Sequence, residues 1–375
     1  MVQYKTIKQI DDSVRNIFFQ GEYFITQKAV KYSFCCGKEI ESLLQSSGLL
    51  HFKNLQNKEG GLNIEFVSDK DIHFDGYRLS VISNKVSIYF SNYRGAIYGL
   101  RQLYSLLSVS NTVVTLPVIC IDDYPSFPLR GVIEGFYGEP YTFQTRLSVL
   151  EFLNKYRYNA YFYAPKDEPC HRAEWRKPYV SDKLSEIESL NARSKQLNID
   201  FYFCISPGLD FNFCNECDYS ALKAKLRQVL DLGVTHFCLL MDDIKAVLTE
   251  EEGQKFSTVA ESQSFLANAM EQYLKCIDSE SQFIFCPTEY MQNFDTPYRT
   301  QLRKYLSKTI AVFWTGYNTV AEKIDEQDAI RVKNSFDRQL VLWDNYPVND
   351  FAPKSRIYLG ALCNRASTLS NYHIG

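Results

Sequence analysis

Eight short apolar runs recur between residue 129 and the C-terminus, and amphipathic, helix-like segments separate them. The runs read LRGVIEGFYG, YNAYFYAPK, DFYFCISPG, THFCLLMDD, QFIFCPTEY, TIAVFWTG, LVLWDNYPV and NYHIG. Helix-like segments include 146–156 and 218–233, the second ending at a predicted capping glycine, Gly233. Strands that alternate with helices in this way predict parallel βα units. We therefore expect a (β/α)8 barrel of the TIM type, with a doubly wound open sheet as the alternative.

The last of these runs ends at Gly375, where the sequence stops. A barrel needs a helix after its eighth strand. We therefore expect the final helix to lie outside this sequence or to be replaced by a neighbour.

A small α/β domain is predicted before the barrel. Residues 76–90 alternate apolar and polar side chains on both sides of a turn at 83–85, which is typical of a β-hairpin. Residues 94–107 have helical periodicity, and Gly95 and Gly99 would let that helix lie close to the sheet. Residues 116–131 contain three prolines and are interpreted as a link between domains. The expected domains are 1–125 and 126–375.

Composition excludes several classes of partner. The net charge is −3, which gives no basic surface for nucleic acid and none for an acidic membrane. The N-terminus does not resemble a signal peptide, and no window approaches ~18 consecutive apolar residues. We expect a cytoplasmic protein without nucleic-acid or membrane partners, although a secreted form lacking its leader would have the same sequence.

The cysteines indicate reduced thiols and no metal. There are eleven, an odd number, and Cys120, Cys204, Cys238 and Cys286 lie in apolar runs. Cys214 and Cys217 have the spacing of half a zinc site. Because no second paired motif accompanies them, we expect no metal.

Polar and aromatic side chains gather where the predicted barrel strands end. Active sites of such barrels lie at the carboxyl ends of the strands. The residues at these positions are Glu134, Gly135, Tyr137, Lys166, Asp167, Asp242, Asp243, Glu289, Tyr290, Trp314, Thr315, Trp343, Asn345 and Asp350. Stability alone would not require so many carboxylate, amide and aromatic groups there.

Asp242 and Asp243 stand out among these residues. They follow the apolar run FCLLM, and a buried, unpaired carboxylate costs several kcal/mol, so a functional reason is expected. Two other Asp-Asp pairs, at 11–12 and 122–123, are interpreted as solvated turns. Adjacent carboxylates repel each other, which favours a proton on one of them. Two carboxylates with aromatic walls are suited to cleaving a glycosidic bond.

The motifs RGVIEGFYGEPYT, YNAYFYAPKDEPCHRAEWRKPY, DLGVTHFCLLMDDI, CPTEY, FWTG and LWDNYPVNDF occur in this order. Together they resemble glycoside hydrolase family 84, which contains the protein O-GlcNAcases and related bacterial β-N-acetylglucosaminidases. The resemblance covers residues 125–375. The preceding region resembles the small domain that precedes the barrel in this family and in the β-hexosaminidases.

The resemblance implies a retaining mechanism in which the substrate's own 2-acetamido group is the nucleophile. Asp242 would orient and polarise the acetamido nitrogen while an oxazoline forms. Asp243 would be the general acid and then the base that activates water.

The resemblance also implies a sugar-binding set. Tyr290, Thr315 and Trp343 would hold the acetamido group, and Gly135, Lys166, Asn345, Asp350 and Asn364 would hold the hydroxyls. Glu134 and Tyr137 would support these residues from outside. Structural alternatives are a surface ion pair for Lys166, barrel packing for Tyr290 and Trp343, and a loop role for Asn364.

The expected function is therefore an exo-β-N-acetylglucosaminidase without metal or organic cofactor. Its partners would be GlcNAc-containing glycoconjugates, including O-GlcNAc-modified proteins. Two alternatives stay open: an endo-acting, hyaluronidase-like hydrolase and a non-catalytic GlcNAc-binding module. No long C-terminal extension is present, so small or exposed conjugates are the safer substrates to expect.

Overall fold

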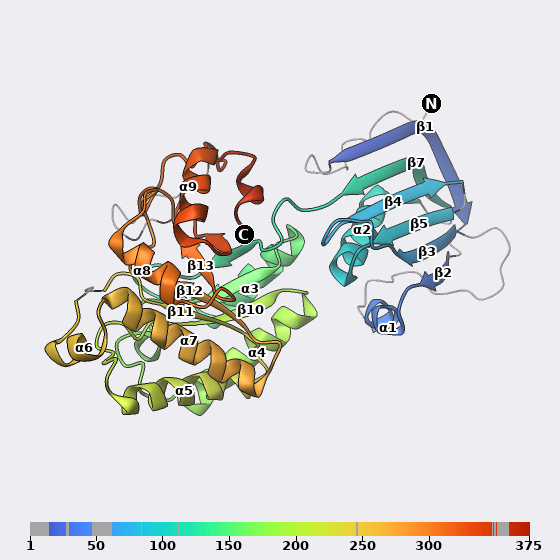
Figure 1. Cartoon of the computed structure of the whole chain (residues 1–375). Coiled ribbons are helices and arrows are strands. Elements are labelled where there is room, and N and C mark those ends of the chain that lie inside the picture. The colour runs from blue at the N-terminus through green and yellow to red at the C-terminus, as the bar shows by residue number, and fades with distance from the viewer. Residues whose placement is uncertain are drawn as a thin grey trace. The chain divides into compact units, whose positions relative to one another are not determined.

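The computed structural model describes residues 15–27, 30–46, 62–83, 85–110, 113–244, 247–346, 348, 350 and 360–375. Contacts between residues divide the chain into two compact units, Met1–Pro128 and Leu129–Gly375. Figure 1 shows one sheet in each unit, with the first unit coloured from blue to teal and the second from green to red.

The first unit is a mixed sheet with helices. In its described residues the strand order is β1-β7-β4-β5-β3-β2, with β6 also paired to β7. The strands are β1 (Asn16–Gln27), β2 (Val30–Cys35), β3 (Leu62–Ser68), β4 (Tyr77–Ile82), β5 (Lys85–Phe90), β6 (Ser108–Ser110) and β7 (Val113–Asp123). The helices are α1 (Lys38–Ser46) and α2 (Tyr93–Leu106). Leu62, Ile64 and Phe66 of β3 are fully buried, whereas the residues between them are partly exposed, so this strand presents one face to a core.

The predicted hairpin and helix of this unit are confirmed. β4 and β5 pair antiparallel, from Tyr77 opposite Phe90 to Ile82 opposite Lys85. A Cβ atom on Gly99 of α2 would lie 2.7 Å from the Ile88 side chain of β5. The helix therefore packs on the sheet at a distance that only glycine permits there.

The interpretation of residues 116–131 as a link is wrong for their first half. Residues 116–123 belong to β7, an inner strand that pairs with β1 and β4. Pro117 is tolerated because it lies beside an irregularity of β1 between Phe19 and Tyr23, and the pairing with β4 begins only at Ile119.

The second Asp-Asp pair is consequently not a turn. Asp122 lies on β7 and accepts a hydrogen bond from Arg78 Nε at 2.8 Å, and Asp123 is 7% exposed. The first pair, at 11–12, lies outside the described residues.

The second unit has a curled parallel sheet. In its described residues the strand order follows the sequence, β8 to β14, and every neighbouring pair is parallel. The strands are β8 (Gly131–Ile133), β9 (Ala160–Tyr163), β10 (Asp200–Ile205), β11 (His236–Leu240), β12 (Gln282–Cys286), β13 (Ala311–Trp314) and β14 (Leu340–Leu342). These correspond to the first seven predicted runs.

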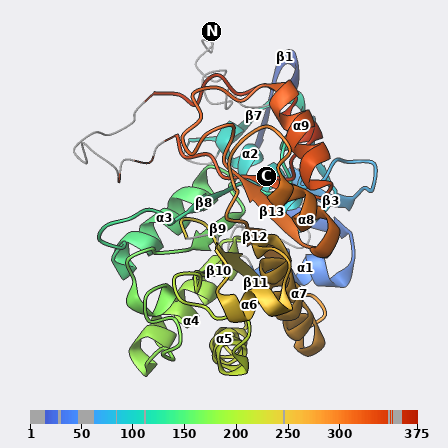
Figure 2. The same ribbon diagram turned by 60° about the vertical axis from the view of Figure 1, so that its left-hand side comes forward.

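Helices connect the successive strands and surround them (Figure 2). They are α3 (Phe143–Lys155), α4 (Ser181–Gln196), α5 (Glu216–Leu230), α6 (Glu250–Lys255), α7 (Val259–Ile277), α8 (Pro297–Tyr305) and α9 (Glu326–Phe336), with short 3-10 turns η2 (Pro169–His171) and η3 (Leu369–Asn371). Side chains of Thr, Asn or Asp cap six of them, at Thr142, Asn215, Thr249, Thr258, Thr296 and Asp325. The helices predicted at 146–156 and 218–233 are confirmed as α3 and α5, and Gly233 has φ +76° beyond the end of α5.

Both faces of the parallel strands are buried, as expected of a barrel. Phe162, Cys204, Cys238 and Phe313 belong to the inner cluster. The residues between them along the strands, such as Phe203, are equally buried but face outward, towards the helices. The predicted fold class is confirmed: mixed α/β with a curled parallel sheet of the barrel type.

The eighth predicted strand is not formed as such. Only the last two residues occupy its place: Ile374 N donates to Leu340 O at 2.9 Å, and Leu342 N donates to Gly375 O at 2.8 Å. On the other side, Leu129 N donates to Ile374 O at 2.8 Å. These residues thus link the end of the sheet at β14 to the segment that precedes β8.

The earlier residues of the predicted run 371–375 belong to a turn. Tyr372 N and His373 N both donate to Leu369 O at 3.0 Å, so their backbone groups close the turn that begins with η3. A strand cannot form from amides that are already bonded within a turn.

Candidate active site

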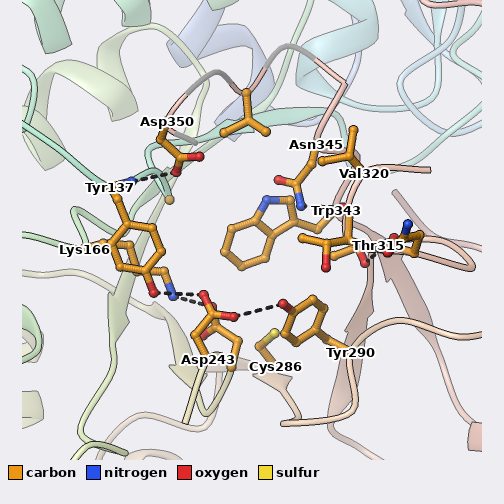
Figure 3. A pocket seen from close by; sticks show the side chains of 15 residues that line it. Tyr137, Lys166, Asp243, Cys286, Tyr290, Thr315, Val320, Trp343, Asn345 and Asp350 are labelled. Carbon is orange, nitrogen blue, oxygen red and sulfur yellow. Dashed lines mark hydrogen bonds and ion pairs between the residues drawn. The ribbon is translucent and has the colours of Figure 1, made fainter. Parts of the chain in front are cut away.

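A cavity of about 590 Å³ lies at the carboxyl ends of the parallel strands. Its volume is within the range of small-ligand sites, about 300–1,000 Å³. Figure 3 shows side chains converging on it from several strand ends. The lining residues are Gly135, Tyr137, Lys166, Asp242, Asp243, Cys286, Tyr290, Thr315, Asn318, Thr319, Val320, Trp343, Asn345, Val348 and Asp350.

Asp242 and Asp243 enter the cavity from the end of β11. Met241 N still donates to Cys286 O of β12 at 2.9 Å, so the chain is held by the sheet up to the residue before the pair. Asp243 then takes φ +51°, a left-handed conformation that costs an L-residue about 1–2 kcal/mol and that Asp tolerates better than most. Successive residues of a regular strand face opposite ways. The change of backbone direction lets both carboxylates reach one cavity.

Asp242 forms a buried ion pair with Lys166, which follows β9. Lys166 Nζ contacts Asp242 Oδ2, and the two residues are 3% and 5% exposed. The pair therefore lies inside the cavity and is not a surface ion pair. Asp242 Oδ1 has no hydrogen-bond partner among the described residues. This oxygen can accept a hydrogen bond from a ligand N–H or O–H group.

Asp243 accepts hydrogen bonds from two tyrosines (Figure 3). Tyr137 OH donates to Oδ2 at 2.8 Å and Tyr290 OH donates to Oδ1 at 2.9 Å. Burial raises the pKa of both tyrosines above the ordinary value, and the Asp243 carboxylate raises each pKa further. Both hydroxyls therefore keep their protons and remain donors.

Trp343 provides an apolar wall of the cavity. Its ring packs edge-on against Phe313 of the barrel interior, with 5.4 Å between ring centroids. A Cβ atom on Gly135 would lie 2.4 Å from Trp343 Cζ2, so only glycine fits beside the ring. The flat face of an indole is suited to the apolar face of a sugar ring or to a methyl group.

Amide and carboxylate groups complete the lining on the side of β13 and β14. Asn345 Nδ2 donates to Thr319 O at 2.8 Å, which fixes the amide. Asp350 Oδ2 accepts from the backbone N of Tyr137 at 2.8 Å, so Asp350 is held by the loop after β8. Thr315 is anchored through its backbone N, which donates to Tyr290 O at 3.0 Å.

The barrel unit coincides with a match to a known family. The family model described as beta-N-acetylglucosaminidase, NAGidase, matches residues 130–375. The chain belongs to this family, glycoside hydrolase family 84.

The curated proteins that this chain resembles have names that fit this family. The protein O-GlcNAcases of Rattus norvegicus and Mus musculus are each 36% identical over 247 residues, 64% of this chain. This chain spans 26% of the length of each.

Solved structures of similar proteins also match this chain. The structure of CpGH84B matches with a TM-score of 0.84 and 28% identity, covering 96% of this chain and 66% of that one. A mutant of the Thermobaculum terrenum O-GlcNAc hydrolase matches with a TM-score of 0.65 and 35% identity, covering 67% of this chain and 55% of that one.

Nine of the ten residues predicted for the site line the cavity of this family 84 barrel. Asn364 does not line it. Asn364 is exposed, has φ +59°, and its carbonyl accepts from Ile324 N at 2.9 Å. Its predicted contact with a sugar hydroxyl stays a prediction.

Glu134 supports the site from outside the cavity. It is 1% exposed and accepts two hydrogen bonds from Arg146 of α3, at 2.8 and 2.9 Å. It also accepts from Tyr161 OH and from Tyr141 N. These contacts tie the loop after β8, which carries Gly135, to the barrel.

Sequence reasoning missed several residues of the site. Tyr137 was expected to act only as support, yet it lines the cavity and donates to Asp243. The other lining residues that were not predicted are Cys286, Asn318, Thr319, Val320 and Val348. Cys286 is the last residue of β12, so the rule that sites lie at strand ends could have found it.

The described residues contain no group of three His, Cys, Asp or Glu side chains that could hold a metal ion. All eleven cysteines are free thiols. No helix in the described part of the chain is both long and apolar enough to cross a membrane.

Proposed function

We propose that this chain is a retaining exo-β-N-acetylglucosaminidase. It removes terminal β-linked GlcNAc, including O-GlcNAc on Ser or Thr of proteins. The names of the relatives support the substrate class, and family membership supports glycoside hydrolysis. The observation that carries the proposal is the pair Asp242 and Asp243, which reach one cavity but have different partners.

In the proposed reaction the substrate's acetamido oxygen attacks the anomeric carbon. Asp242 Oδ1, the oxygen without a partner, accepts the acetamido N–H and stabilises the positive charge that develops as the oxazoline forms. Lys166 forms the buried ion pair with the other oxygen of Asp242. No protein nucleophile is needed.

Asp243 transfers the protons. It gives a proton to the departing glycosidic oxygen, then takes one from the water that opens the oxazoline, so the configuration is retained. Both of its oxygens accept hydrogen bonds from tyrosine hydroxyls. When a bound acetamido oxygen takes over the Tyr290 hydroxyl, Asp243 loses one of its two donors, and that carboxyl oxygen becomes available to the leaving group.

The remaining lining residues are proposed to bind the sugar. Trp343 and Thr315 enclose the acetamido methyl group, while Gly135, Lys166, Asn345 and Asp350 contact the ring and its hydroxyls. Asn364 is retained in this role as a prediction from the family resemblance.

Exo action is favoured over endo action. The cavity has the volume of a small-ligand site, and Asp350, held by Tyr137 N, lies across the cavity from Asp243 (Figure 3). An endo-acting hydrolase would need an open cleft that accepts sugars on both sides of the cleaved bond. We further propose a reducing, cytoplasmic location, because all eleven thiols are free.

The first test is hydrolysis of fluorogenic and nitrophenyl β-N-acetylglucosaminides by the wild type, Asp242→Ala and Asp243→Ala. Asp243→Ala should lose about 10²–10⁴-fold in kcat/KM, and the loss should shrink as the leaving group improves. Asp242→Ala should lose activity with every leaving group, because oxazoline formation needs the oriented acetamido group.

Three outcomes would decide between functions. A folded wild type that binds GlcNAc without turnover would establish the binding module in place of the enzyme. Release of internal oligosaccharides from hyaluronan would establish endo action. A loss that shrinks with better leaving groups in Asp242→Ala but not in Asp243→Ala would reverse the assigned roles.

A further inference from the structure

Arg172 lies beside the proposed acid, on the loop after β9. The carbonyl of the preceding residue, His171, accepts from Ser206 N at 3.1 Å just after the end of β10. Arg172 N donates to Pro169 O at 3.3 Å, within η2. His171 itself is fully buried. The backbone around Arg172 is therefore held by η2 and by the residue that follows β10.

The guanidinium group of Arg172 connects two other strand ends. Nη1 donates to Tyr137 OH at 2.9 Å, and Nη2 donates to the backbone oxygen of Asp243 at 3.2 Å. The guanidinium carbon lies 5.2 Å from the centroid of the Tyr137 ring. Arg172 thus contacts both Asp243 and the tyrosine that donates to it.

These contacts determine the direction of the Tyr137 hydroxyl hydrogen. A guanidinium group can only donate, and a hydroxyl has one hydrogen to give. Because Arg172 occupies a lone pair of the Tyr137 oxygen, the tyrosine hydrogen is directed to Asp243 Oδ2. Donation to the hydroxyl also polarises it and strengthens its own hydrogen bond.

The second contact holds a strained backbone. Asp243 has φ +51°, and its carbonyl oxygen is the acceptor for Arg172 Nη2. Without this donor, the residue would be freer to return to an extended conformation, in which its carboxylate points away from the cavity.

We propose that Arg172 is a positioning residue for proton transfer. It fixes the backbone of Asp243 directly and its carboxylate through Tyr137. This assignment rests on the proposed function, because it concerns the carboxyl group proposed as acid and base.

Arg172 also places a positive charge near Asp243. Lys166 is ion-paired with Asp242, whereas the hydrogen bonds of Arg172 lead to Asp243. The charged and titratable groups around Asp243 are Asp242, Lys166, Arg172, Tyr137, Tyr290 and Cys286.

The test compares kcat/KM for two aryl β-N-acetylglucosaminides, one with a basic phenol leaving group and one with an activated nitrophenol. Arg172→Met should lose about 10- to 100-fold with the basic phenol and less than about threefold with the activated one, since only the first needs a well-placed acid. Tyr137→Phe should show the same selective loss, and the double variant should lose little more than the larger single loss.

Two further variants separate charge, geometry and folding. Arg172→Lys keeps the charge but cannot make both hydrogen bonds. It should therefore still lose activity selectively with the basic phenol. Arg331→Met, on α9, removes an exposed arginine away from the cavity and should leave both rates unchanged.

The assignment is overturned if Arg172→Met loses activity equally with both substrates or loses none. If Arg172→Met does not fold, Arg172→Lys decides: a selective loss supports the assignment, and wild-type rates overturn it. A wild type that hydrolyses neither substrate overturns the proposed function, and the assignment falls with it.

Discussion

At the scale of single residues, the site depends on how buried charges are compensated. The buried Asp242 forms an ion pair with the buried Lys166, while one of its oxygens stays without a partner in the described structure. The arrangement suits a group that must bind an amide N–H without giving up its charge. Removing one partner leaves an uncompensated charge in a buried place.

Lys166→Met should therefore lower the free energy of unfolding by about 3–5 kcal/mol. The double variant Lys166→Met with Asp242→Asn should recover more than half of that loss, because no charge remains buried. Urea unfolding measures both. Lys177→Met is the control: Lys177 forms an ion pair with Glu174 but is 65% exposed, so it should change stability by less than about 1 kcal/mol. Equal losses in the single and double variants would contradict the argument.

Gly135 is the second residue with a defined steric role. A methyl group there would lie 2.4 Å from Trp343 Cζ2, so Gly135→Ala must displace the ring that walls the cavity. The cost should be about 1–3 kcal/mol of stability, together with weaker sugar binding. Gly253→Ala is the matched control, since Gly253 lies in α6 and a Cβ there would meet nothing within 4 Å. In the control, the free energy of unfolding and the affinity for GlcNAc should be unchanged or higher. Equal losses in both variants would contradict the steric argument.

Single residues also show what sequence can and cannot predict. Asp242 and Asp243 were predicted because a buried strand makes a carboxylate at its end costly. The left-handed backbone of Asp243, which brings the two side chains to one cavity, has no signature in the letters Asp-Asp. Arg172 was missed because several other charged residues surround it in the loop, and only its distances to Tyr137 and Asp243 distinguish it.

At the scale of elements, the barrel strands were predictable because both of their faces are buried and each reads as a continuous apolar run. Two elements were not. β7 contains Pro117, and proline normally indicates a loop, but the bulge in its partner β1 accommodates it. The last run, 371–375, looks like a strand, yet its first amides close a turn.

The loop between β8 and α3 depends on Glu134 and Arg146, and Glu134→Gln tests this dependence. The glutamine side chain has nearly the size of glutamate but lacks the negative charge that compensates the buried Arg146. Its amide NH2 group is a donor and would face the donors that Glu134 accepts from. In this variant the backbone amides of residues 135–142 should exchange hydrogen faster than in the wild type. The free energy of unfolding should fall by about 3–5 kcal/mol.

Glu151→Gln is the control for Glu134→Gln. Glu151 lies on α3 itself and pairs with Arg193, but the side chains of the two residues are 51% and 39% exposed. Exchange in residues 135–142 should be unchanged in this variant. Unchanged exchange in Glu134→Gln as well would show that the loop is held by other contacts.

At the scale of the whole chain, two buried histidines should make stability depend on pH. Burial, with the charge of Lys166, lowers the pKa of His171 to about 3, and burial lowers the pKa of His373 to about 4. In an unfolded chain both would titrate near 6.5. Between these values the unfolded chain binds protons that the folded chain does not, so stability is fully present above about pH 6.5 and falls as the pH is lowered.

The expected decrease is about 1.4 kcal/mol per pH unit for each histidine between about pH 6.5 and 4. Histidine NMR signals of the folded chain, assigned with His171→Gln and His373→Gln, should show both rings neutral at pH 5. Each variant should also reduce the proton uptake on unfolding at pH 5 by about one proton. A ring that titrates near pH 6.5 in the folded chain would mean that water reaches it. For His171 this would also loosen the loop that holds Arg172, because Ser206 bonds to the backbone of the same residue.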